Sequence, residues 1–210
     1  MISRPGREKE GRQAGEKELW KTLWGLDPDD VCARAAAAFD PATGQYRLNF
    51  FSRTVLISPA AKTISGTTPR DDLLLSSLQD YAPFAIPGYL VHAKDILPSG
   101  KLIKPSAMKG GQIYLTGSHV LPLPRIAARY GSDRNGFLTR GRDLGGQELS
   151  HGDAAVRLFP FPRIAVALLL WTGDEEFAAR ADLLVDAACE AQLPPDIMWT
   201  TAMMSVLAML

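Results

Sequence analysis

Three consecutive carboxylates form the densest group of side chains in this sequence that could hold a metal ion. Asp174, Glu175 and Glu176 follow directly on a long apolar run, and the end of a sheet strand commonly presents functional groups. With His119 and Asp153 they would supply oxygen and imidazole ligands suited to magnesium, manganese or iron. The alternative is a solvated turn whose acidic residues cap a helix.

His119 and His151 are further candidates, because an imidazole can act as a base or as a ligand near neutral pH. Each lies beside glycine or serine in a stretch that we expect to be a loop. His151 immediately precedes Gly152-Asp153, so Asp153 could orient it, although adjacent side chains in a strand point apart. Loop histidines are also often simply exposed, and that interpretation stays open.

Arg163 and Trp171 flank the apolar run and complete the set of candidate ligand contacts. Arg163 follows a proline, and its planar guanidinium suits recognition of a carboxylate or a phosphate. A structural ion pair with Asp174 or Glu176 is the alternative. Trp171 ends the run, and Thr172-Gly173 separates it from the acidic residues.

The sequence lacks the signatures of the commonest enzyme classes: a Walker loop, GxGxxG after a strand, a GxSxG elbow and an HExxH helix. Its two cysteines, Cys32 and Cys189, are too few and too isolated for a disulfide framework or a four-ligand zinc or iron–sulfur site. Cys189 lies in an apolar-rich segment and is expected to be a core residue rather than a nucleophile. No cofactor is assigned, and whether the protein is an enzyme stays open.

Composition argues against two classes of partner. The 210 residues include 23 Lys+Arg and 23 Asp+Glu, so the formal net charge is zero, and no general attraction to nucleic acid or to an anionic membrane is expected. The apolar runs 164–171 and 197–210 are shorter than the roughly 18 to 20 residues that cross a bilayer. The N-terminal residues lack the apolar core of a secretory signal, so the expected location is the cytoplasm.

Capping and turn residues divide the chain into elements that would position these candidates. Asp27-Pro28 and Thr68-Pro69 each combine an N-cap with proline at the first helical position. Trp20 and Trp24, four residues apart, are expected to pack into the core from one helix face. Helices are predicted over 16–26, 29–39, 69–82, 121–130, 135–144, 181–191 and 195–210. The segment 82–117 is expected to be rich in loops, with short strands at 101–104 and 112–115.

Strands are predicted where apolar residues alternate or run together. Residues 45–51 and 54–58 should form one hairpin. Residues 153–159 and 164–171 should form another, joined by a Pro-Phe-Pro turn, with the second strand central and covered on both faces. We therefore expect a flexible polar tail over residues 1–18 and a single α+β domain over 19–210, with a mainly antiparallel sheet built from hairpins and helices packed around it.

Several short motifs together resemble a known family. They are the segment Gly110–Gly117 with Ser118-His119, then GDAA at 152–155, FPR at 161–163, WTGDEEF at 171–177 and LPPDIMW at 193–199. From about Asp27 to its C-terminus the chain is similar to the prokaryotic family called domain of unknown function 3786.

This resemblance implies no established activity. Members occur mainly in anaerobic bacteria and archaea, some fused to small iron–sulfur or corrinoid-protein-like modules, so it implies a link to anaerobic redox or one-carbon metabolism. Because this chain lacks an iron–sulfur cysteine cluster, it would serve a partner that carries one.

Three hypotheses follow. The first is a non-catalytic accessory or ligand-binding module that engages a small ligand, or a redox or corrinoid protein partner, through the Gly110–His119 loop and the acidic segment 173–177. The second is a metal-dependent enzyme acting hydrolytically on a small substrate, with a carboxylate–histidine site built from His119, His151, Asp153, Asp174, Glu175 and Glu176. The third is an interaction protein whose C-terminal helix, rich in methionine and leucine, docks on another subunit.

Overall fold

Two antiparallel sheets share one hydrophobic core in the computed structural model, which describes residues 5–115 and 120–210. In spatial order, the first sheet contains β1 (Ala38–Asp40), β2 (Gln45–Phe50), β3 (Arg53–Ser58) and β4 (Thr63–Gly66). The second contains β5 (Leu102–Ile103), β9 (Arg180–Asp186), β8 (Ile164–Trp171), β7 (Ala154–Phe161) and β6 (Gln147–Leu149). These strands all pair antiparallel, which confirms the predicted sheet type.

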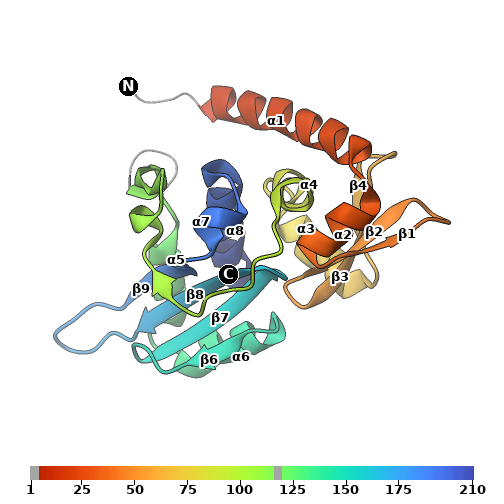
Figure 1. Ribbon diagram of the computed structural model, residues 1–210. Helices are drawn as coiled ribbons and strands as arrows, with labels where there is room; N and C mark the ends of the chain where they lie inside the picture. The colour runs from red at the N-terminus through yellow and green to blue at the C-terminus, as the bar shows by residue number, and fades with distance from the viewer. Residues whose placement is uncertain (1–4, 116–119) are drawn as a thin grey trace.

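Helices pack around both sheets (Figure 1). They are α1 (Pro5–Gly25), α2 (Pro28–Ala35), α3 (Pro69–Ser77), α4 (Ala82–His92), α5 (Leu123–Tyr130), α6 (Arg134–Asp143), α7 (Cys189–Gln192) and α8 (Pro195–Met209), with 3₁₀ turns η1 (Pro105–Ala107) and η2 (Gly111–Leu115). Helices α5, α7 and α8 lie against one face of the second sheet, and α1 packs along α4 (Figure 1). The predicted α+β class is confirmed. None of the helices described is long and apolar enough to span a bilayer.

The predicted helix starts are confirmed by their hydrogen bonds. Asp27 Oδ1 accepts from the backbone N–H of Asp29 at 3.0 Å and caps α2. Helix α3 begins with a reciprocal capping box. The Asp71 N–H donates to Thr68 Oγ1 at 3.3 Å, and the Thr68 N–H donates to Asp71 Oδ2 at 3.0 Å.

The hairpin of β7 and β8 lies at the centre of the second sheet, as predicted. Its register runs from Ala154 opposite Leu170 to Phe161 opposite Ile164, with an irregularity between Leu158 and Phe161. Strand β7 therefore continues through Pro160, beyond the predicted end of the strand. Proline cannot donate to the ladder, but it is tolerated at such an irregularity because regular pairing is interrupted there.

The two faces of β8 meet different surroundings. Its even-numbered residues belong to the main core beneath the helices. Ala167 and Leu169, on the opposite face, form a small separate cluster with Ala155 of β7. Partly buried residues packed against this cluster also come from the second sheet or its strand ends.

Aromatic residues of α4, β7 and β2 connect the two sheets. The Tyr89 ring stacks on Phe161 with centroids 4.4 Å apart and planes 8° from parallel, and Phe161 lies 5.6 Å from Phe50 of β2. The Tyr89 hydroxyl donates to the Ala35 carbonyl at 2.8 Å and accepts from the Arg163 N–H at 3.2 Å. Helix α4 thus holds the first sheet, α2 and the β7–β8 turn together.

The loop-rich segment predicted over 82–117 contains α4, and its predicted strand at 112–115 is the 3₁₀ turn η2. Pro87 lies inside α4, and an interior proline removes one helical hydrogen bond. Burial on nearly every side compensates, since Phe84, Ile86, Tyr89 and Leu90 are all at most 8% exposed. The prolines that suggested loops therefore do not prevent this helix.

The helix predicted over 181–191 is wrong in its first part, because residues Arg180–Asp186 form β9 and only Cys189–Gln192 are helical. The alanine and leucine content favours a helix. Antiparallel pairing of these residues with β8, from Val166 to Trp171, outweighs this helix propensity. The helix predicted over 29–39 ends earlier, at Ala35, because Ala36 adopts a left-handed conformation with φ of 50° and β1 follows.

Helix α1 buries only part of the aromatic face predicted for it. Trp20 is 3% exposed and packs with Leu19 and Leu23, whereas Trp24 is 66% exposed. The predicted core role is correct for Trp20 and wrong for Trp24. The helix also continues across residue 18, so the division of the chain at that position stays a prediction.

Candidate functional site

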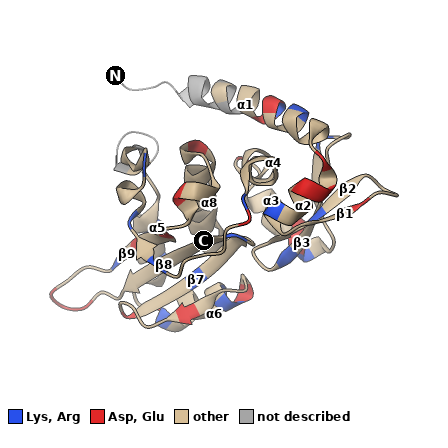
Figure 2. Ribbon diagram, in the orientation of Figure 1, with Lys and Arg blue, Asp and Glu red and all other residues tan. Residues whose placement is uncertain are grey.

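The predicted acidic site lies on the exposed loop between β8 and β9, which projects beyond the second sheet (Figure 2). Asp174 Oδ1 accepts the backbone N–H groups of Phe177 at 2.7 Å and Glu176 at 2.9 Å. These two hydrogen bonds lower the pKa of the Asp174 carboxyl. Glu175 and Glu176 are exposed, so this segment has the geometry of a solvated, side-chain-capped turn.

Asp153 holds the end of the β7–β8 hairpin. Its Oδ2 accepts from Thr172 N at 2.8 Å and from Thr172 Oγ1 at 2.9 Å. Asp153 and the exposed His151 line a small cleft of about 230 Å³ together with Arg134. Asp153 therefore already has a structural partner.

The predicted carboxylate–histidine site was to be built from His119, His151, Asp153 and the acidic residues 174–176. In residues 5–115 and 120–210, no three His, Cys, Asp or Glu side chains are placed to share a metal ion. His119 lies outside the described residues. The metal site therefore stays a prediction.

Arg163 and Trp171 each have a structural partner. The Arg163 guanidinium, 13% exposed, pairs with Asp95, so an ion pair is present, but with a different partner from the predicted Asp174 or Glu176. Trp171 lies beneath the guanidinium of Arg180, whose central carbon is 3.9 Å from the ring centroid, a favourable cation–π distance.

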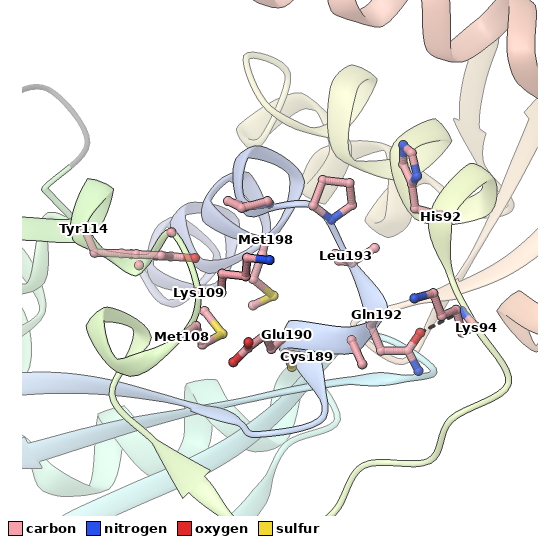
Figure 3. A pocket seen from close by; sticks show the side chains of 15 residues that line it. His92, Lys94, Met108, Lys109, Tyr114, Cys189, Glu190, Gln192, Leu193 and Met198 are labelled. Atoms are coloured by element: carbon pink, nitrogen blue, oxygen red, sulfur yellow. Dashed lines mark hydrogen bonds between the residues drawn. The ribbon is translucent and has the colours of Figure 1, made fainter.

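A larger cavity of about 650 Å³ opens between the end of α4, the turns η1 and η2, and the α7–α8 segment (Figure 3). We call it the α4–α8 cavity. Its wall consists of His92, Lys94, residues 108–111, Tyr114, residues 189–195 and Met198. This volume lies within the range of roughly 300 to 1,000 Å³ typical of small-molecule sites.

Tyr114 is the most informative residue of this wall. Its side chain is 8% exposed, and its hydroxyl has no hydrogen-bond partner among the described residues. The hydroxyl end points into the cavity (Figure 3). Burial raises the pKa of Tyr114 well above its usual value, so the group stays protonated and can donate. A buried hydroxyl without a partner is unfavourable, and a ligand can satisfy it.

Two other titratable side chains of the wall are uncharged near neutral pH. Burial raises the pKa of Cys189 to about 12, so this thiol is not a ready nucleophile. Burial lowers the pKa of His92, against the opposing charge of Asp196. His92 and Pro194 also line a second groove of about 620 Å³ that α1 forms with α4 and α8.

Two buried polar side chains hold the cavity wall and the segments next to it in place. Gln192 accepts from the Lys94 N–H at 2.7 Å and donates to the Ile96 carbonyl at 2.6 Å. Asp186, 1% exposed, accepts from the N–H groups of Ser99, Gly100 and Ala188. The loop after α4 and the start of α7 are thereby held together.

The cavity residues were not predicted individually, although the predicted Gly110–His119 loop contributes Gly110, Gly111 and Tyr114 to its wall. His92 ends an apolar segment that we interpreted as loop, and Gln192 lies immediately after the helix predicted over 181–191. The sequence feature that could have indicated this cavity is the glycine pair Gly110-Gly111, which shortly precedes Tyr114. The cavity itself depends on contacts between segments about 80 residues apart.

Comparison with known proteins identifies a family. No curated protein and no solved structure matches the chain significantly. A family model does match, over residues 27–208, so α1 lies outside the matched region while the whole α4–α8 cavity lies within it. The chain belongs to the family described as domain of unknown function (DUF3786), as its sequence motifs suggested.

Proposed function

We propose that this protein is a non-catalytic ligand-binding protein that takes a small molecule into the α4–α8 cavity. The observation that carries the proposal is the Tyr114 hydroxyl, which is buried, unpartnered among the described residues and directed into a cavity of about 650 Å³. Concave, mainly apolar sites with a few convergent polar groups are typical of ligand binding.

The chemistry of the wall favours binding over catalysis. Nucleophilic catalysis needs an activated nucleophile with a base within hydrogen-bond reach. The Cys189 thiol donates toward the Ala165 carbonyl, with Sγ 3.8 Å from the oxygen, and its raised pKa keeps it protonated. Tyr114 also stays protonated. Both groups are therefore suited to contact a ligand rather than to attack it.

We further propose that the ligand-binding role is accessory to an anaerobic redox or one-carbon protein. The support is the family resemblance, in which related domains are joined to iron–sulfur or corrinoid-protein-like modules. With only Cys32 and Cys189, this chain would act beside a cluster-bearing partner. The Gly110–His119 loop is the proposed contact with the ligand, because its described part lines the cavity.

A ligand screen with a matched pair of variants tests the proposal. Thermal shift against corrinoids, haem, flavins, nucleotides and metal ions should identify a stabilising compound, and titration calorimetry then measures its Kd. Tyr114→Phe should weaken that Kd about tenfold, as loss of one hydrogen bond predicts. The unfolding free energy of the free protein should not fall, because the hydroxyl has no described partner to lose.

Tyr130→Phe is the control. The buried Tyr130 hydroxyl donates to the Met209 carbonyl at 2.6 Å and lies outside the cavity wall. Its removal should lower stability by about 1 kcal/mol and leave the Kd unchanged. Equal affinity of the wild type and Tyr114→Phe, or no stabilising compound in the screen, would contradict the proposal.

A further inference from the structure

We infer that the α4–α8 cavity takes an apolar organic acid, meaning a flat or hydrocarbon body that carries one anionic group. This inference rests on the proposed ligand-binding role and adds the chemical class of the ligand. It derives from two features of the wall: an apolar floor containing two methionines, and two lysines without ion-pair partners among the described residues.

The apolar part of the wall comes from separate elements. Met108 follows η1, Leu193 precedes α8 and Met198 lies within it, and all three are at most 7% exposed. The Tyr114 ring completes this surface from η2. Methionine is flexible and polarisable and makes favourable contacts with aromatic rings. Such a wall adapts to a flat apolar body.

The charged part of the wall favours an anion. Lys109 reaches in from the turn between η1 and η2, and Lys94 from the chain after α4 (Figure 3). Glu190 is the opposing carboxylate of the described wall, and its side chain is exposed, as are those of both lysines. The described wall therefore contains two ammonium groups and one carboxylate, and the protonated Tyr114 hydroxyl adds a hydrogen-bond donor. The His92 side chain is uncharged near neutral pH and does not change this balance.

Two fluorescent probes that share the same aromatic rings distinguish the contribution of the apolar body to binding from that of the anionic group. 8-Anilinonaphthalene-1-sulfonate carries a sulfonate, and N-phenyl-1-naphthylamine has the same rings without it. The sulfonate probe should bind at least about fivefold more tightly, the size expected from partly exposed ion pairs. Lys94→Gln combined with Lys109→Gln should remove this preference without weakening the neutral probe, and Glu190→Gln should increase it.

A blocking variant assigns the binding to this cavity. Ala191 is exposed and lies in its wall, so Ala191→Trp should fill the cavity without disturbing the core. Ala107→Trp is the control, because Ala107 is exposed in the neighbouring turn η1 but does not line the cavity. The first variant should abolish probe binding, and the second should preserve it.

The possible outcomes separate the two proposals. Preference for the sulfonate probe that depends on both lysines and is lost in Ala191→Trp supports the organic acid. Equal binding of both probes, blocked by Ala191→Trp, overturns the ligand class and retains the ligand-binding role. If neither probe binds, or if Ala191→Trp leaves binding intact, both the ligand class and the proposed site are overturned.

Discussion

The side-chain amide of Gln192 bonds the backbone N–H of Lys94 at 2.7 Å, across 98 residues of sequence. The same amide donates to the Ile96 carbonyl. Gln192 is 1% exposed. One buried side chain of α7 thus sets the distance between two walls of the α4–α8 cavity.

Replacing Gln192 by leucine should loosen this wall. The volume is similar, but both hydrogen bonds to the chain after α4 are lost, which should cost about 2 kcal/mol of unfolding free energy. Chemical denaturation measures the loss, and probe titration should show weaker binding at the same time. Gln147→Leu, on the exposed strand β6, should change stability by less than about 0.5 kcal/mol. Equal effects of the two substitutions would contradict this role of Gln192.

Asp186 should contribute more to folding stability than Asp182, which lies on the same strand. The Asp186 carboxylate accepts several N–H groups, and an asparagine amide would direct its own N–H₂ toward some of them, so Asp186→Asn should cost about 3 kcal/mol. Asp182 has a side chain that is 36% exposed, a 3.7 Å ion pair with Lys104 and one hydrogen bond, from the neighbouring Leu183 N–H at 2.8 Å. Asp182→Asn should therefore cost less than about 1 kcal/mol. Denaturant unfolding of both variants at neutral pH makes the comparison.

The stability from Asp186 should disappear in acid. Burial alone would raise the pKa of its carboxyl, but the hydrogen bonds from Ser99, Ala188 and Gly100 outweigh burial and lower it. A carboxyl with a lowered pKa stabilises the fold above its unfolded pKa, near 3.8, and loses that contribution as pH falls through the folded value. The unfolding free energies of wild type and Asp186→Asn should therefore converge once the pH is below the folded pKa of Asp186. A constant difference down to the acid transition would contradict the assignment.

His92 should give the protein a second, milder dependence on pH. Burial lowers the pKa of His92 below the reference value of 6.5, so between the two values the unfolded chain binds more protons. Stability is then fully present above about 6.5 and declines as pH falls toward the folded pKa. Melting temperatures from pH 5 to 8 should show a shallower decline for His92→Gln than for wild type. If the melting temperatures of the two proteins fall in parallel with pH, His92 is not the origin of the decline.

The two tryptophans of α1 provide a matched test of its packing. Trp20→Ala removes a side chain that is 3% exposed and should cost about 3 kcal/mol. Trp24→Ala removes one that is 66% exposed and should change stability by about 0.5 kcal/mol or less. Urea unfolding followed by circular dichroism distinguishes them. A small effect of Trp20→Ala would mean that α1 contributes little to the core.

Local signals were sufficient for much of the fold. The caps at Asp27 and Thr68 predicted where α2 and α3 begin, because a side-chain oxygen next to proline satisfies the helix start whatever packs around it. The alternation of apolar residues predicted the β2–β3 hairpin, and the continuous apolar run predicted the central strand β8. Each of these signals acts within a few residues.

Tertiary contacts decided the elements where local preference and environment disagree. Helix α4 forms despite Pro87 because its sides are buried, and residues Arg180–Asp186 form a strand because β8 needs a partner along its edge. Trp24 remains exposed although it follows Trp20 by one helical turn. In α4 and β9, packing or pairing with a distant segment outweighs a propensity of about 1 kcal/mol or less per residue, or the larger cost of an interior proline.

By itself, the sequence determined the family, the α+β class and the central hairpin, because these depend on motifs and periodicities contained in short segments. It also drew attention to the Gly110–His119 loop. Only the tertiary structure decided that Arg163 pairs with Asp95, that the acidic run is an exposed turn, and that Tyr114, Lys94 and Gln192 border one cavity. A cavity exists only where distant segments fail to fill the space between them, and no local pattern of residues encodes that space.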